Sequence, residues 1–337
     1  MLHFTFESAH MKTLGVNWLN TSAPHNNQDA SMSTGSPYGM FGFKVKRPLN
    51  DYEQIHHFDV KQRASDRVHY ELSLIKLNST FVEGVDKWYA TRGGIAMAMT
   101  LLSTPAIYSL GGIWLYARQH MSHPGIVIAL LMGLGLLLFC IYAFTRDAFT
   151  YTHYPIRFNR KNRQVYAFRR DGTVLKAGWE DLYWTIYGSG VGLQSIFVAG
   201  HVLSPNGQVQ ETIGLADVTA GREGEADLCT FFEFYRRYME EGPERVLQAL
   251  KPTPLIMLPG IHKKKESWRF GWERLTLHMN GWPILMILYQ VFAFPESFFR
   301  WFVMRTSKIP QWPQWVEDEC VIDPEDPWIR DERHAAK

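Results

Sequence analysis

Two long uncharged apolar stretches constrain this chain more than any other feature. Residues 93–117 run for twenty-five positions and residues 124–145 for twenty-two without a charged side chain. As α-helices they would extend roughly 33–37 Å, enough to cross a hydrocarbon core of about 30 Å. A helix in a water-soluble protein rarely stays uncharged for so long, because its ends and one face meet water. The pattern predicts a transmembrane hairpin over 93–145.

The basic residues that flank this hairpin predict its orientation. The link between the helices, 118–123, contributes only Arg118, whereas the flanking segments 76–92 and 146–163 contain eight basic residues (Lys76, Lys87, Arg92, Arg146, Arg157, Arg160, Lys161, Arg163). The positive-inside rule therefore places both termini in the cytoplasm. The first thirteen residues lack the apolar core of a secretory signal, and a hairpin of this kind suits a bacterial inner membrane, with a eukaryotic membrane left open.

The two apolar stretches have the character of an anchor. Neither has an ionisable side chain in its middle, which ion paths and proton relays normally need. Ala129 and Gly133 form a small-xxx-small step, which favours either contact between the two hairpin helices or a homodimer. Bacterial membrane lipids are thus the first expected partner.

Charge and cysteine content exclude several other classes of protein. The 35 Lys and Arg against 33 Asp and Glu leave a net charge of +2, so nothing indicates a nucleic-acid partner. The three cysteines (Cys140, Cys229, Cys320) are far apart, which argues against a disulfide scaffold or a cysteine-rich zinc site.

The soluble regions predict an antiparallel β-domain after the hairpin. Residues 1–39 are rich in Ser, Asn, Gly and Pro and are expected to be disordered; the cytoplasmic segment 40–92 contains one predicted strand at 67–77. Within 146–243, turn signals at Asn162 and Asp171–Gly172 separate alternating, half-buried strands, and about six strands in sixty residues predict a small sandwich or barrel.

After the strands, apolar residues recur at helical spacing, which predicts one amphipathic helix over 225–241 with Arg236 and Arg237 on its solvated side. The expected fold class is an α+β membrane protein: a transmembrane hairpin (93–117, 124–145), a PH-like β-sandwich or barrel closed by this helix, and an interfacial helical tail.

Specific segments carry a resemblance to a known family. RFNRKNRQVYAFRRDG (157–172), WEDL (179–182) and FEFYRRYMEEGPE (232–244) resemble an uncharacterised proteobacterial family with two transmembrane helices and a PH-like cytoplasmic domain. Many of its members are encoded beside type VI secretion effectors. The resemblance covers about 145–250 and the hairpin. It implies a protein partner, a secreted effector or toxin, and brings no catalytic residues.

The tail, 244–337, predicts interfacial helices and an acidic end. Residues 281–294 are apolar for only fourteen positions before Pro295 and Glu296 interrupt them, which favours a helix pair lying in the interface or packed on the hairpin. A third span over 281–304 is the alternative, and it would bury Glu296 and Arg300. The acidic segment 316–332 is expected to be solvated.

No catalytic, cofactor or metal constellation is predicted. His120 and His123 lie three apart beside Arg118 without further ligands, Gly188–Gly192 lacks the spacing of a phosphate loop, and Glu180 and Asp181 fall at a turn. We therefore expect a protein that is not an enzyme.

The remaining candidate surface is basic. It comprises two strand segments and a short run in the tail, which lipid headgroups or a partner would contact (Arg157, Arg160, Lys161, Arg163, Arg169, Arg170, Lys263, Lys264, Lys265). The expected function is a non-catalytic inner-membrane protein that binds a partner by occlusion, as an immunity or accessory protein for a type VI effector. The alternative is a scaffold that contacts lipid headgroups.

Overall fold

The computed structural model describes residues 43–118, 124–188, 195–220, 224–251, 255–276 and 283–335. The predicted disordered segment 1–39 and the histidines of the hairpin link (His120 and His123) lie outside the described residues. The strands are β1 (Arg47–Pro48), β2 (His57–Phe58), β3 (Leu74–Leu77), β4 (Phe81–Gly84), β5 (Ile156–Asn159), β6 (Gln164–Phe168), β7 (Val174–Gly178), β8 (Leu182–Tyr187), β9 (Ser195–Leu203) and β10 (Gln208–Ala220). The helices are α1 (Asp51–Ile55), α2 (Gly94–Ala117), α3 (Pro124–Asp147), α4 (Glu225–Glu241), α5 (Pro243–Ala249), α6 (Trp268–Thr276), α7 (Pro283–Thr306) and α8 (Gln314–Glu319).

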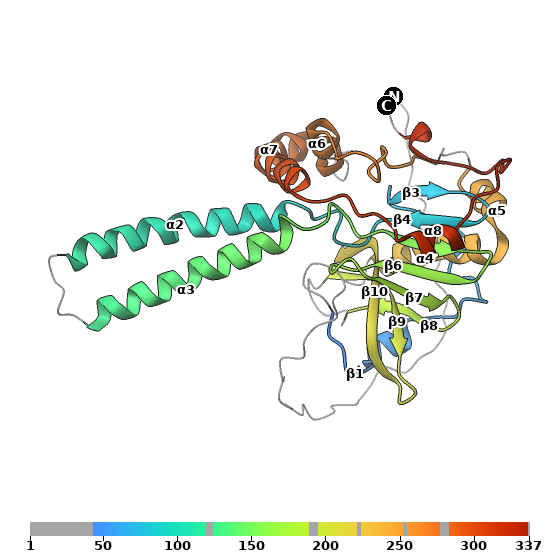
Figure 1. The fold of residues 1–337 in the computed structure, drawn as a ribbon, viewed down its shortest axis with the longest axis horizontal. Coiled ribbons are helices and arrows are strands. Elements are labelled where there is room, and N and C mark those ends of the chain that lie inside the picture. The colour runs from blue at the N-terminus through green and yellow to red at the C-terminus, as the bar shows by residue number, and fades with distance from the viewer. Residues whose placement is uncertain are drawn as a thin grey trace. The chain divides into compact units, whose positions relative to one another are not determined.

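The two apolar stretches form the helices α2 and α3, which lie side by side (Figure 1). Both are long and apolar enough to cross a membrane, and few of the residues in their most apolar stretches are buried. Gly133 marks the contact between them: a Cβ at this position would lie 2.4 Å from Cδ2 of Leu110. The small residue therefore lets the two hairpin helices approach closely.

Two antiparallel five-stranded sheets make up the β-domain. Their strand orders are β1-β10-β9-β8-β2 and β3-β4-β5-β6-β7. The turn at Asp171–Gly172 forms as its sequence indicates, with Gly172 at a φ of +86° that favours glycine. The sheets are larger than predicted, because the segment 40–92 supplies four strands (β1 to β4), whereas the sequence pattern predicted one.

The strand predicted at 67–77 forms only over its last four residues, as β3. Just before it the chain turns: the Ser73 N–H donates to the carbonyl of Tyr70 at 3.1 Å, and Glu71 and Leu72 both have a φ of +45°. Backbone in this left-handed region cannot continue a strand. Val68, Tyr70 and Leu72 alternate with polar residues as in a strand, but they belong to a segment that turns, and they pack against the core from there.

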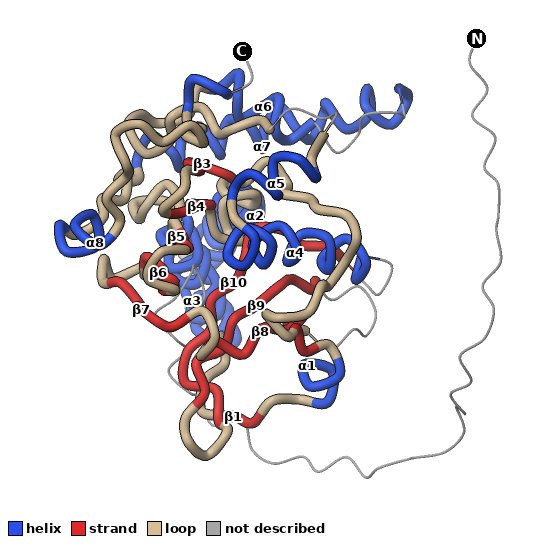
Figure 2. The backbone as a smooth tube through the Cα atoms, turned by 90° about the vertical axis from the view of Figure 1, so that its right-hand side faces the viewer, coloured by secondary structure: helices blue, strands red, loops and turns tan. Residues whose placement is uncertain are grey.

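Helix α4 contacts β9 and β10 of one sheet and β5 of the other (Figure 2). Every residue from Phe231 to Met239 is buried. Aromatic rings fill the space around it, with Trp179 stacked on Phe232 and Phe158 packed on Tyr235 at centroid distances of 5.9 and 4.5 Å. The prediction that Arg236 and Arg237 face solvent is wrong. Both are buried, and both donate to the fully buried Glu233 carboxylate. The segment before β3 covers this face of α4: the Ala64 N–H donates to Glu233 at 3.0 Å, and the His69 N–H donates to the carbonyl of Thr230 at 3.1 Å.

The tail differs from its prediction in two ways. Helix α7 runs without interruption through Pro295 and packs against α6 and α2. The acidic end packs on the protein through its apolar side: α8 and the residues after it lie on the sheet that contains β5, β6 and β7, where Val316 and Cys320 pack on Phe81 and Tyr166. Most of its carboxylates remain exposed, as expected, and Asp326 is buried. Strand β5 is consequently buried on both faces instead of half-buried.

Candidate functional site

The predicted basic surface is dispersed and largely neutralised within the chain. Arg157 is only 1% exposed, so its prediction as a lipid or partner contact is wrong. Its Nε donates to Glu83 at 2.9 Å and its two terminal nitrogens donate to Glu317 at 3.2 Å. The tail carboxylate takes the position that we expected an external anion to occupy.

The other basic residues of the strands have similar partners. Lys161 pairs with Asp323 at 2.9 Å, Arg163 with Glu180 and Glu240, and Arg169 with Glu211. Arg160 is half-buried near Gly242, and Arg170 lies near Arg146 at the base of α3, where burial and that second guanidinium lower its pKa. In the tail, Lys263 pairs with Glu332, Lys265 donates to the carbonyl of Arg305, and Lys264 is exposed. The nine residues thus form no single patch.

A polar network at the start of the β-domain is the most developed site. Helix α1 begins with a capping box: Asn50 Oδ1 accepts from the Glu53 N–H at 2.8 Å, and the Glu53 carboxylate accepts from the Asn50 N–H at 3.0 Å. The Arg47 guanidinium donates to both carboxylate oxygens of Glu53, at 2.6 and 2.7 Å. Local sequence therefore folds 47–55 around one carboxylate.

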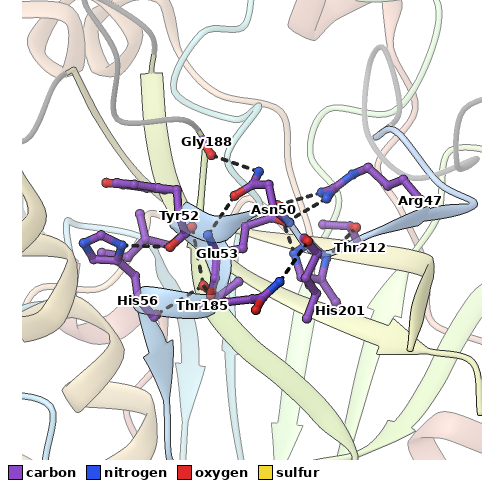
Figure 3. A network of polar contacts seen from close by, with 12 residues as sticks. Arg47, Asn50, Tyr52, Glu53, His56, Thr185, Gly188, His201 and Thr212 are labelled. Atoms are coloured by element: carbon purple, nitrogen blue, oxygen red, sulfur yellow. Dashed lines mark hydrogen bonds and ion pairs between the residues drawn. The ribbon is translucent and has the colours of Figure 1, made fainter. Parts of the chain in front are cut away.

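Three strands of the sheet complete this network from far along the chain (Figure 3). His201 of β9 places Nε2 3.5 Å from the Glu53 carboxylate and Nδ1 2.8 Å from the hydroxyl of Thr212 in β10. Thr185 of β8 donates to the carbonyl of Glu53 at 2.6 Å. All four side chains, of Glu53, Thr185, His201 and Thr212, are fully buried.

The charges of this network follow from its contacts. Burial alone would raise the pKa of Glu53, but hydrogen bonds from His201, Arg47 and the Asn50 backbone outweigh it and lower the pKa to about 2. Burial lowers the pKa of His201, against the opposing effect of Glu53. The imidazole is therefore neutral at pH 7 and fits Nε2–H facing Glu53, with Thr212 donating to Nδ1.

Glu53, His201 and Thr212 have the residue types of a catalytic acid–histidine–hydroxyl triad, but not the accessibility of one. The Thr212 hydroxyl is buried and inaccessible to substrate, and the Thr185 hydroxyl donates its hydrogen bond to a backbone carbonyl. The network instead ties the segment 47–56 to the sheet, since it joins β1 and α1 to β8, β9 and β10.

A surface pocket of about 440 Å³ opens beside the network. Lys44, Arg47, Asn50, Tyr187 and Gly188 line it, together with Pro48 and Leu49. Lys44 is exposed, and the Arg47 guanidinium lies 5.5 Å from the centroid of the Tyr187 ring. Asn50 Nδ2 donates to the carbonyl of Gly188 at 3.3 Å. With two cations and one aromatic ring, the pocket suits a small carboxylate or another anionic group.

Sequence reasoning did not find this site. The one local signal was the Asn50-x-x-Glu53 capping pattern, because Glu53 and His201 are 148 positions apart and meet only when β9 pairs in the sheet. The neighbouring histidines have separate partners: His56 lies 3.3 Å from Glu225, and His57 stacks on Tyr183.

Fold and site together define an α+β protein with two antiparallel sheets and two exposed apolar helices. The model of a family of unknown function, DUF6708, matches residues 134–324, more than half of the chain, and the chain belongs to this family. No curated protein and no solved structure matches it. The matched region runs from α3 past α8; it contains His201 and Tyr187 and leaves out Arg47 and Glu53.

Proposed function

We propose that this protein is a non-catalytic, membrane-anchored binding protein whose β-domain captures a protein partner at the membrane surface. The hairpin supports the anchoring: nearly the whole surface of α2 and α3 is apolar and exposed, and this surface is stable only when something apolar covers it. Both termini would lie in the cytoplasm, at a bacterial inner membrane, and the β-domain would act as a PH-like module.

The pocket beside the Glu53 network is the observation that carries the binding proposal. It lies at β1, the edge strand of its sheet, where an extended segment of a partner has access. Lys44 supplies a positive charge that is not shared with Glu53. An acidic side chain of the partner would enter here, while the adjoining sheet edge fixes its register.

The family resemblance gives the partner a class. An immunity or accessory protein would bind a type VI effector and occlude it: it would cover the active surface of the toxin and would not cleave the toxin. Buried contacts that fix the segment 47–56 support this mode, because a rigid surface loses less entropy on binding.

Charge reversal at the pocket tests this function. Lys44→Glu in the full-length protein should weaken binding to the product of the neighbouring effector gene and sensitise cells to delivery from sibling cells. Lys46→Glu is the matched control, since Lys46 is exposed two positions away and does not line the pocket. If deletion of the whole gene leaves recipient cells unharmed, the immunity role is wrong.

The alternative is a scaffold that contacts lipid headgroups. The observation in its favour is the proximity of Arg170 to Arg146 at the point where α3 ends. Anionic headgroups would relieve the mutual repulsion of these two guanidinium groups. Binding of the reconstituted protein to vesicles that is independent of salt and of anionic lipid would exclude this role.

A further inference from the structure

Five aromatic rings of α6 and α7 form one surface cluster, here called the aromatic patch (Trp268, Trp272, Phe294, Phe298, Trp301). Trp268 lies 5.8 Å from Phe294, 6.4 Å from Phe298 and 6.5 Å from Trp301, measured between ring centroids. Trp272 lies 5.8 Å from Phe294. Trp268, Phe294 and Phe298 are 41%, 55% and 43% exposed, which is unusual for a packed group of large rings.

The patch is one face of α7, and the opposite face is buried. Phe294, Phe298 and Trp301 follow helical spacing, and Val291, one turn earlier, is 70% exposed. Arg300 points the other way, where it donates to the buried Glu266 carboxylate at 2.9 and 3.0 Å. Helix α7 thus buries the Arg300 charge inside the domain and exposes aromatic rings on its other face.

The orientation of α7 relates this face to the membrane. In Figure 1 the hairpin helices α2 and α3 lie lengthwise and α7 is seen nearly end-on, whereas Figure 2 shows α7 from the side and looks along the hairpin. The axis of α7 therefore runs across the hairpin. The two meet at the hairpin base, where Val303 packs with Ala96 and Ala148. A hairpin that crosses a bilayer places such a helix parallel to the membrane surface.

Basic side chains border the patch. Arg305 is exposed and lies 6.0 Å from the centroid of the Trp301 ring. Arg269, next to Trp268 in α6, is also exposed and pairs with Glu273 at 2.7 Å. Tryptophan and phenylalanine beside arginine are typical of helices that lie at the level of lipid headgroups. A second protein copy would need no such arrangement of α7 across the hairpin base.

We propose that the aromatic patch inserts into the headgroup region of the leaflet in which the hairpin base lies, so that α6 and α7 lie flat on the bilayer. This rests on the proposed membrane anchoring and adds a second contact to it. A hairpin alone lets the β-domain tilt about its base. The second contact fixes the orientation of the domain, and with it the direction in which the pocket faces.

Site-specific labelling of the reconstituted full-length protein tests this proposal. An environment-sensitive NBD probe is placed on single cysteines at Phe298→Cys, at Leu134→Cys in the middle of α3, and at Ile55→Cys on α1. The three native cysteines are replaced in all three variants. Ile55 is the matched control, an exposed apolar residue of the β-domain that is 77% accessible. Liposomes contain lipids brominated either near the headgroup or deep in the acyl chain.

Position 298 should show blue-shifted emission and be quenched mainly by shallow bromines. Position 134 should be quenched mainly by deep bromines, and position 55 should be quenched only by aqueous iodide. If position 134 is in lipid and position 298 behaves like position 55, the inference fails while the anchoring stands; if position 134 is also in water, the anchoring itself fails. Protection of position 298 from both iodide and bromine would mean that protein covers the patch, which also overturns the proposal.

A second measurement avoids the cysteine replacements. p-Benzoylphenylalanine in place of Phe298, with all native cysteines kept, should form lipid adducts on illumination in liposomes. Adducts to a second copy of the chain, in the absence of lipid adducts, would overturn the proposal.

Discussion

Arg92 and Asp147 are both completely buried and hydrogen-bonded to each other, although they are 55 positions apart at the two ends of the hairpin. Arg92 Nη1 donates to the Asp147 carbonyl at 3.0 Å. The Asp147 carboxylate accepts from the N–H groups of Gly93 and Ala96 at 3.0 and 3.1 Å, so that it caps α2 from the end of α3. The base of the hairpin is therefore closed by one carboxylate.

Removing that carboxylate should destabilise the base of the hairpin. Asp147→Ala leaves the Arg92 charge buried without its acidic partner and α2 without its cap, and we expect a loss of about 3–5 kcal/mol. Thermal unfolding of the detergent-solubilised full-length protein measures it. Asp66→Ala, at an exposed position, is the control; equal melting temperatures for the two variants would contradict this account.

A methyl group at Gly93 should also be costly. Gly93 has a φ of +92°, and a Cβ there would lie 2.3 Å from the backbone nitrogen of Arg300 in α7. Gly93→Ala should therefore cost about 1–3 kcal/mol through backbone strain, with a further cost from the clash. Gly111→Ala in α2 is the matched control, since a Cβ there meets no atom within 4 Å. Unfolding midpoints of the two variants in the same detergent distinguish the sites.

The Glu53 network predicts a specific pH dependence of stability. The pKa of Glu53 is about 2 in the folded protein and near 4.5 ordinarily, so its ionisation stabilises the fold above pH 4.5 and ceases to do so as the pH falls toward 2. Glu53→Gln should lower stability at pH 7 by about 1–3 kcal/mol, because Arg47 and His201 lose an ionised partner.

The measured quantity is the difference in unfolding free energy between wild type and Glu53→Gln, recorded from pH 7 to pH 2. This free-energy difference should be constant above pH 5 and should become smaller as the pH falls below 5. Glu244→Gln, on the exposed surface of α5, serves as the control. A wild-type advantage that stays unchanged down to pH 2 would refute the assignment.

The acidic tail should mask basic residues of the strands. Glu317→Gln, Glu319→Gln and Asp323→Asn together remove the partners of Arg157, Lys176 and Lys161. The variant should be retained longer on a cation-exchange resin than a control of the same net charge, because the exposed side chains of Lys161 and Lys176 become available to the resin. That control neutralises Asp51, Asp66 and Glu244, which are exposed elsewhere. Identical elution of both triple variants would show that the tail masks nothing.

Local sequence predicted the elements whose structure depends on near neighbours. The two apolar helices needed only their length and lack of charge, and the Asp171–Gly172 turn needed only the ability of glycine to adopt a positive φ. Helix α4 forms over Glu225–Glu241 with its apolar residues at helical spacing. Such signals lie within one or two turns of chain and do not depend on distant segments.

The burial of charged residues could not be predicted in this way. Arg157 alternates with apolar neighbours as a solvated residue would, and it is buried because Glu317, 160 positions later, brings the tail over its strand. Arg236 and Arg237 are buried because the segment that contains Ala64 and His69 lies over their face of α4. Hydrophobic periodicity shows that one face of a helix or strand is apolar and the other polar. It does not show whether the polar face contacts water or a carboxylate of the same chain.

The sequence by itself determined that the chain has two apolar helices, a β-domain and no cysteine-based scaffold, because composition and short-range periodicity fix these properties. Only the tertiary structure decided which charges are neutralised, that Glu53 and His201 meet beside a pocket, and that α7 lies across the hairpin. Those relationships join segments that are far apart in the chain, and their energies depend on burial, which arises only when the sheets, the helices and the tail have packed together.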